Sequence, residues 1–293
     1  MGEPITTNPE NIPNEHRVLN AWNTKEILVL GMTYPAYSNK YTELVCTGAI
    51  EEDTKRLIRI HPMPKRYLDE GQGFKNFQRI EARVQRNRHD PRPESIRVDF
   101  PSVRPLDEIP AKTPEARRAY LEQSPSLVRS VEELQGLNAR FGMSLGIVVP
   151  KSIDVKIRKR TPSERAEWYA TERKFMSQKT LELVRPPKKI DFPEAEFLVT
   201  WTCNDPRCTK GHTSGLRSWS IHEGYRKLKR DPARDKKMLE TMEREFDLTK
   251  RDVFLFLGTF HNHQTTFGLM DAYRPKKRIV EAPSPQLGLF ARS

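Results

Sequence analysis

The sequence predicts an α+β protein with an N-terminal small β-barrel or curled sheet, a helical middle and a C-terminal β-α-α-ββ segment that carries a candidate zinc knuckle. Three observations predict this class. Short apolar or alternating stretches crowd the first third of the chain, as is typical of strands. Proline and hydroxyl capping signals then begin helices. Finally, cysteines and histidines gather late in the chain, at a spacing that suits a metal ion.

The N-terminal block is predicted to hold five strands. The clearest alternation places Ile80, Ala82 and Val84 on one face of a strand and Arg79 and Arg83 on the other. Short strands this close together fit OB-like, SH3-like and PUA-like barrels, although such a fold does not by itself give a function. The predicted strands cover residues 25–32, 43–50, 56–61, 77–87 and 95–100.

Three helices and two strands are predicted in the middle of the chain. The first helix follows Thr113, with a proline at its first position. Capping boxes begin the other two, at Ser130 and Thr161. The strands cover residues 143–150 and 152–160, and the second of them alternates apolar and charged side chains. One face of this second strand is therefore expected to be solvated.

The last part of the chain is predicted to run strand, turn, helix, helix and β-hairpin. The strand covers residues 196–202, and the helices cover 216–228 and 234–246. The hairpin turns at 261–263, a literal His-Asn-His triplet. HNH nucleases need a helix after the second strand of their motif, whereas the residues that follow here alternate as a strand does. We therefore interpret the triplet as turn residues.

Composition divides the chain into five parts. Residues 1–23 are proline-bearing and poor in apolar anchors, which predicts a flexible arm. Residues 24–184 form the predicted barrel-like domain with its helices. The stretch 185–195 is rich in proline and lysine, which is typical of a linker. Residues 196–275 make up the knuckle-containing segment, and 276–293 are expected to be a disordered tail.

The charge balance favours a polyanionic partner. The 293 residues include 51 Lys and Arg against 39 Asp and Glu, a net charge of +12. Such an excess favours nucleic acid, through release of counterions. Three cysteines are too few for a disulfide framework, and no apolar run is long enough to span a membrane. We therefore expect a cytoplasmic protein. The phosphate-binding glycine motifs and the G-x-S-x-G nucleophile motif are absent from the sequence, which disfavours nucleotide hydrolysis and dinucleotide redox chemistry.

A metal site is predicted at the knuckle. Cys203, Cys208 and His212 follow a C-x4-C-x3-H spacing, and thiolate and imidazole are the ligands that zinc prefers. The fourth ligand is expected to be His222, or alternatively His261 or His263 from the hairpin turn. Four protein ligands would make a structural site, whereas three ligands and a water would make a catalytic one.

Nucleic acid, DNA or RNA, is the predicted partner. Arginines and lysines on strand faces would contact phosphates, and an aromatic loop would stack on bases. The predicted contact residues are Arg59, Arg79, Arg83, Lys156, Arg158, Arg160, Tyr37 and Lys40.

Two rival functions remain open from the sequence. Asp154 and Lys156 have the D-x-K form of metal-dependent nucleases, which would use Mg or Mn. Alternatively, the basic charge could dock an acidic protein partner, as in an adaptor. The leading hypothesis is a nucleic-acid-binding protein with one structural zinc, an accessory or subunit of a nucleic-acid-processing or defence assembly.

Overall fold

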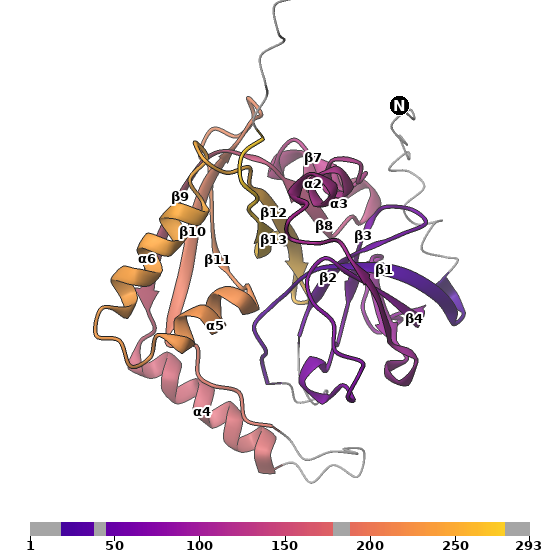
Figure 1. Cartoon of the computed structure of the whole chain (residues 1–293), viewed down its shortest axis with the longest axis horizontal. Coiled ribbons are helices and arrows are strands. Elements are labelled where there is room, and N and C mark those ends of the chain that lie inside the picture. The colour runs from indigo at the N-terminus through magenta and orange to yellow at the C-terminus, as the bar shows by residue number, and fades with distance from the viewer. Residues whose placement is uncertain (1–18, 38–44, 178–187, 279–293) are drawn as a thin grey trace, which may run out of the picture.

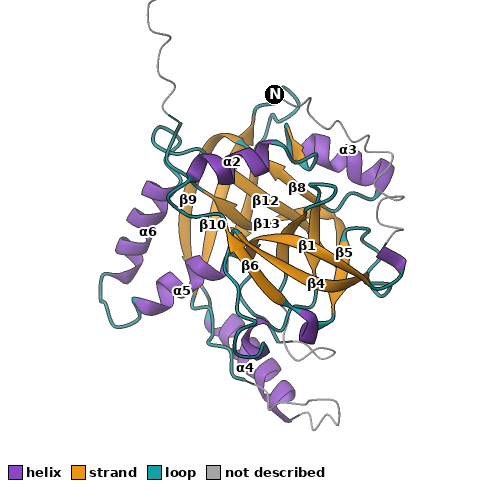
Figure 2. Ribbon diagram, turned by 45° about the vertical axis from the view of Figure 1, so that its right-hand side comes forward, coloured by secondary structure: helices purple, strands orange, loops and turns teal. Residues whose placement is uncertain are grey.

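The fold is α+β, as predicted, and begins with a closed barrel (Figure 1). The structure, a computed structural model, describes residues 19–37, 45–177 and 188–278. In Figure 1 the barrel lies on the right and two further sheets lie to its left. The helix α6 (Arg234–Glu245) lies at the left edge, and α5 (Trp219–Lys227) lies between it and the barrel. Figure 2 shows that helices surround the strands rather than separate them.

The barrel closes because its first strand pairs on both sides. β1 pairs with β2 and also with β4, and Ile27 lies opposite Glu51 on one side and Ile80 on the other. Alternation along β4 buries Ile80, Ala82 and Val84, which confirms the face predicted from the sequence. The strand order is β1-β2-β3-β5-β4, with β6 added to β4. The strands are β1 (Asn23–Met32), β2 (Thr47–Glu51), β3 (Leu57–Ile60), β4 (Gln78–Arg86), β5 (Ser95–Val98) and β6 (Arg104–Glu108).

Capping side chains begin two of the three helices of the middle region as predicted, whereas Thr113 precedes the first helix without a side-chain capping hydrogen bond. The Ser130 hydroxyl accepts a hydrogen bond from the Glu133 backbone N–H at 3.1 Å. At Thr161 the capping box is reciprocal, because its hydroxyl accepts from the Glu164 N–H and its own N–H donates to the Glu164 carboxylate. The helices are α2 (Pro114–Glu122), α3 (Val131–Phe141) and α4 (Pro162–Ser177), and single 3-10 turns cover Lys65–Tyr67 and Phe100–Ser102.

Two further sheets, whose strands pair mostly in an antiparallel way, complete the described fold. The three-stranded sheet has the order β11-β10-β9, and the four-stranded sheet has the order β13-β12-β8-β7. The predicted linker 185–195 falls between β9 and β10, which pair with each other along most of their length. The strands are β7 (Leu127–Val128), β8 (Leu145–Val148), β9 (Pro150–Lys159), β10 (Ala195–Cys203), β11 (His212–Leu216), β12 (Phe254–Phe260) and β13 (His263–Tyr273).

Apolar packing joins the barrel to the sheets behind it. One cluster includes Leu28 and Ile50 from the barrel together with Ile147, Phe254 and Phe256 from the four-stranded sheet. A larger cluster lies between the two C-terminal sheets and the helices α3, α5 and α6. Because the first cluster spans both halves of the chain, the barrel and the C-terminal half share a core. No helix in the described ranges is both long and apolar enough to cross a membrane.

Parts of the predicted organisation lie outside the described residues. They are residues 1–18 of the arm, 38–44 with Lys40, 178–187 with the first residues of the linker, and 279–293 of the tail.

Candidate functional site

Four side chains that can bind a metal meet where β10 ends and β11 begins. Cys203 is the last residue of β10, and His212, the first of β11, lies opposite Trp201. The Cys208 sulfur accepts a hydrogen bond from the Cys203 N–H at 3.2 Å and lies 3.3 Å from Nε2 of His212. The same nitrogen lies 3.2 Å from Glu132 Oε1, and the four ligand atoms are all within 4.8 Å of one another.

The turn between the cysteines is fixed by its own residues. The Asp205 carboxylate accepts hydrogen bonds from the Arg207 N–H at 2.9 Å and from the Ser130 hydroxyl at 3.0 Å. The second bond ties the turn to the beginning of α3, which carries Glu132. Gly211 has a φ of +67°, and a Cβ there would lie 2.9 Å from the Trp201 carbonyl oxygen. The return to His212 therefore requires glycine.

These residues fit a metal ion. Two sulfurs, one imidazole nitrogen and one carboxylate oxygen form a set of mixed donors within reach of a single cation. The second Glu132 oxygen, Oε2, is buried and makes no hydrogen bond within the described part of the chain. Burial, with the neighbouring Cys208 and Glu132, raises the pKa of Cys203 to about 12. A bound cation would stabilise the charged forms of these groups.

The other predicted ligands lie elsewhere. His222 packs between Tyr34 and Phe197, with ring centroids 4.8 and 4.9 Å away. His261 and His263 are exposed in the hairpin turn, and neither belongs to the group of metal-binding side chains. His261 instead lies 4.0 Å from Asp90. Glu132 takes the fourth place instead. The capping box of Ser130 and Glu133 indicates from the sequence that Glu132 lies in the first turn of a helix. Nothing in the sequence indicates that this helix packs beside the cysteines.

A basic cavity lies between the barrel and the C-terminal half. Its volume is about 340 Å³, and none of the described residues that line it is acidic. Tyr34, Trp168 and Phe260 contribute aromatic rings to its walls. Its ionisable lining consists of Arg59, Arg92, Arg160 and Arg217, the histidines His61, His222 and His261, and Cys46.

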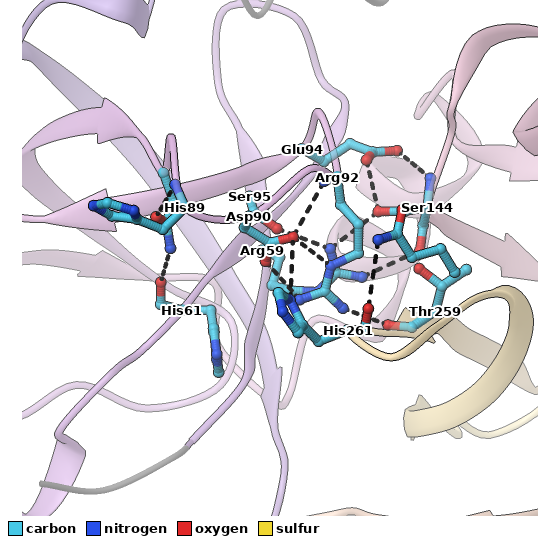
Figure 3. A network of polar contacts seen from close by, with 12 residues as sticks. Arg59, His61, His89, Asp90, Arg92, Glu94, Ser95, Ser144, Thr259 and His261 are labelled. Carbon is cyan, nitrogen blue, oxygen red and sulfur yellow. Dashed lines mark hydrogen bonds and ion pairs between the residues drawn. The ribbon is translucent and has the colours of Figure 1, made fainter. Parts of the chain in front are cut away.

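Arg92 joins the barrel to the C-terminal half (Figure 3). It donates through Nε and Nη2 to the Asp90 carboxylate at 2.8 and 2.6 Å, and through Nη1 to the Thr259 carbonyl at 2.6 Å. Both members of the ion pair are nearly buried, with side chains 6% and 3% exposed. The Arg92 guanidinium, beside the Asp90 carboxyl, lowers the pKa of Asp90 to about 2, although burial opposes this shift. The loop before β5 is therefore clamped onto β12.

Arg59 makes a second buried connection in the same network (Figure 3). Its guanidinium donates to the hydroxyls of Ser95 and Ser144 at 3.1 and 3.0 Å. Ser144 in turn donates through its N–H and its hydroxyl to the Glu94 carboxylate at 2.6 and 2.7 Å. Arg59 is 1% exposed, so this predicted phosphate contact lies at the inner wall of the cavity and not on an outer face.

Arg160 and Arg217 complete the basic lining. Arg160 donates to the Glu164 carboxylate at 3.0 Å. Arg217 is an exposed residue whose guanidinium lies over the Phe260 ring, 4.6 Å from its centroid, and makes no ion pair or side-chain hydrogen bond with any described residue. Of the four arginines, Arg217 is thus the one whose charge is left for a ligand.

The comparisons divide the chain between two families. Residues 23–123 match a domain of unknown function (DUF8758). Residues 128–293, more than half of the chain, match a second domain of unknown function (DUF8757). The chain belongs to the DUF8757 family. No curated protein matches it. The DUF8757 region contains the whole metal-binding group, whereas the cavity takes its lining from both matched regions.

The remaining predicted nucleic-acid contacts are engaged with acidic partners. Arg79 pairs with Glu52 and Asp107, Arg83 with Asp99, Lys156 with Asp154, and Arg158 with Glu164 and Glu196. Tyr37 is 8% exposed and packs against Trp168 and Phe175. Its ring is therefore covered by other aromatic side chains.

Asp154 lies on the solvated face of β9, as predicted. Its side chain is 62% exposed, and that of Lys156 is 75% exposed. Asp154 is not part of a metal-binding group, since the one such group among the described residues is formed by Glu132, Cys203, Cys208 and His212. The nuclease alternative, with its Mg or Mn, gains no supporting observation from this geometry.

Two cavity histidines should make stability depend on pH. Burial, reinforced by neighbouring arginines, lowers the pKa of His61 and of His222 from 6.5 to about 4. For His61 these neighbours are Arg92 and Arg59, whereas the Asp90 carboxylate acts to raise its pKa. Both imidazoles are therefore neutral in the folded protein at pH 7.

Acidification should destabilise the protein before its carboxylates titrate. Because the folded pKa lies below the unfolded value, each histidine contributes stability above pH 6.5 that is lost as the pH falls towards 4, up to about 3 kcal/mol per group. The melting temperature of the wild type should fall through this range. The fall should be smaller in His222→Gln, whereas the exposed control His89→Gln should behave as the wild type does. A melting temperature that stays constant from pH 6.5 to 4.5 would contradict this assignment.

Proposed function

We propose that this protein binds single-stranded nucleic acid at the basic cavity. We also propose that a zinc ion, held by Glu132, Cys203, Cys208 and His212, stabilises its C-terminal half. The observation that carries the proposal is the composition of the cavity wall, with four arginines and no acidic side chain among the described lining residues. Phosphate groups are the ligands that such a wall suits, since guanidinium groups bind them through paired hydrogen bonds.

The aromatic lining supports a single strand as the ligand. Tyr34, Trp168 and Phe260 share the cavity with the arginines. Proteins bind unpaired bases by stacking them on such rings while cations follow the backbone, whereas bases in a duplex stack on each other and are not available. A cavity of about 340 Å³ suits one nucleotide unit rather than a helix.

The outer basic residues offer less to a nucleic acid. Arg79, Arg83 and Arg158 each form ion pairs with carboxylates of the protein itself. A phosphate that bound them would have to compete with these carboxylates. The Arg217 guanidinium has no such competitor among the described residues, which supports the cavity as the binding site.

Zinc is the metal that best suits the donors. Two cysteine sulfurs, one histidine nitrogen and one glutamate oxygen make four protein ligands, and four-coordinate sites closed by protein are typical of structural zinc. Such an ion would link the first turn of α3 to the turn between β10 and β11. Its role would be to hold these elements together, without a free coordination position for a substrate.

Direct binding tests the proposal. Labelled single-stranded RNA, single-stranded DNA and duplex DNA are titrated with the protein by fluorescence anisotropy at 50 and 200 mM salt. We expect binding to a single strand that weakens with salt, and a loss of at least about tenfold in Arg217→Glu, since a charge reversal removes one phosphate contact and adds repulsion. Arg140→Glu makes the same change of charge at an exposed residue of α3 outside the cavity, and should bind as the wild type does.

Two outcomes would contradict the proposal. One is no binding of any of these ligands at 50 mM salt. The other is equal weakening by Arg217→Glu and Arg140→Glu, which would make binding a matter of net charge alone. A stable complex with an acidic protein in the absence of nucleic-acid binding would favour the adaptor alternative.

A further inference from the structure

We infer that the basic cavity receives a phosphate monoester, either the phosphorylated end of a strand or a free nucleotide, and not the middle of a continuous strand. This inference rests on the proposed function in so far as the ligand is a nucleic-acid strand. It says which chemical group of the ligand occupies the cavity, and three features of the cavity support it.

The inner wall of the cavity is closed. Arg59 and Met270 line it and are 1% and 8% exposed, and Gly258 beside them is buried. A Cβ on Gly258 would lie 2.5 Å from the Met270 sulfur and 3.2 Å from Arg59 Nη2, so the strands are packed tightly at this point. Among the described residues, β3, β12 and β13 close the inner side of the cavity to a chain that enters past the exposed Arg217. The cavity can hold an end or a single unit.

The positive charge of the cavity favours the more highly charged of the two phosphate groups. A phosphate monoester carries about −1.5 to −2 charges at pH 7, whereas each phosphodiester carries one. Asp90 pairs with Arg92, and Glu94 is linked to Arg59 through the Ser144 hydroxyl, so these two inner arginines are partly compensated. Arg160 pairs with Glu164, whereas Arg217 adds a charge that forms no ion pair with any described carboxylate.

Hydrogen-bond donors without partners surround the same space. Arg160 Nε, Trp168 Nε1 and the Thr259 hydroxyl are buried and make no hydrogen bond within the described residues, and all three residues line the cavity. Buried donors are rarely left unsatisfied in proteins, because each costs the free energy of its lost hydration. A phosphate monoester offers three acceptor oxygens, which small adjustments of these side chains could reach.

The test compares the ends of one oligonucleotide. The same single-stranded sequence is prepared with a 5′-phosphate, with a 3′-phosphate and with hydroxyls at both ends, and a nucleoside 5′-monophosphate is used as a competitor. We expect one phosphorylated form to bind at least about tenfold more tightly than the unphosphorylated form. Arg160→Gln should remove most of this difference, whereas Lys151→Gln, an exposed residue of β9 outside the cavity, should keep it.

The outcomes separate this inference from the proposed function. Equal binding of the three oligonucleotides, still weakened by Arg217→Glu, would overturn the inference and leave the proposed function standing. Binding of the monophosphate without binding of any oligonucleotide would support the inference, with a free nucleotide as the ligand, and would overturn the proposed function. If none of the ligands bound, both would fail.

Discussion

A Cys203→Ser variant is expected to lose the proposed zinc ion and to melt at least about 10 °C below the wild type. Cys203 is 3% exposed and lies within the large core between the C-terminal sheets. Structural zinc contributes roughly 10–16 kcal/mol in isolated zinc fingers, and we expect about 5 kcal/mol here because an apolar core supports the same region. For a chain of this size, each kcal/mol shifts the melting temperature by roughly 2–4 °C.

Elemental analysis and calorimetry of the same samples check this prediction. Cys46→Ser is the matched control, since Cys46 is the one cysteine outside the metal-binding group. It should keep one zinc per chain. Wild-type protein without metal, or a Cys203→Ser variant that loses zinc but melts as the wild type does, would contradict a structural role for the ion.

An Asp90→Ala variant should lose about 3–5 kcal/mol of stability, because it leaves the nearly buried Arg92 guanidinium without its carboxylate. Arg92 also holds the Thr259 carbonyl of β12, so the contact between the barrel and the C-terminal half should loosen with it. Chemical denaturation followed by circular dichroism measures the change in the free energy of unfolding.

Asp99→Ala is the matched control for the buried pair. Asp99 also pairs with an arginine, Arg83, at 3.1 Å, but the Arg83 side chain is 54% exposed. Its removal should cost at most about 1 kcal/mol, as is usual for exposed pairs. If the two variants lost the same stability, the buried network would not be the connection between the halves that its geometry indicates.

Local patterns predicted most of the fold. Alternation along β4 and the capping residues at Ser130 and Thr161 depend on near neighbours in the sequence, and the structure contains these elements. β6 and β11 were missed. The sequence of β6, RPLDE, contains a proline and three charged residues, and that of β11, HTSGL, is mostly polar. Each is a strand because a partner strand offers it backbone hydrogen bonds, which the sequence does not show.

The site depends more on distant contacts. Cys203, Cys208 and His212 are close in sequence and meet within one turn. Glu132 joins them only because α3 packs against the end of β10. Arg59 looked like a solvated side chain from the alternation of β3, yet all four residues of that strand are buried, because the C-terminal half covers the outside of the barrel there.

The cavity could not be predicted from the sequence for the same reason. Its wall combines Arg92, from the loop before β5, with Thr259 and His261, from the end of β12 and the hairpin turn. These segments meet only in the folded protein. The sequence did indicate an excess of positive charge. It did not indicate that most outer arginines would be paired with carboxylates while Arg217 would form no ion pair with a described residue.

Photochemical cross-linking tests the central claim most directly. The protein is irradiated with a single-stranded oligonucleotide that carries a photoreactive base, and the modified residues are identified by mass spectrometry. Binding at the cavity predicts modification of Tyr34, Trp168 or Phe260, and its loss in Arg217→Glu. Modification confined to the solvated face of β9, around Lys156, with the cavity residues untouched, would contradict the account.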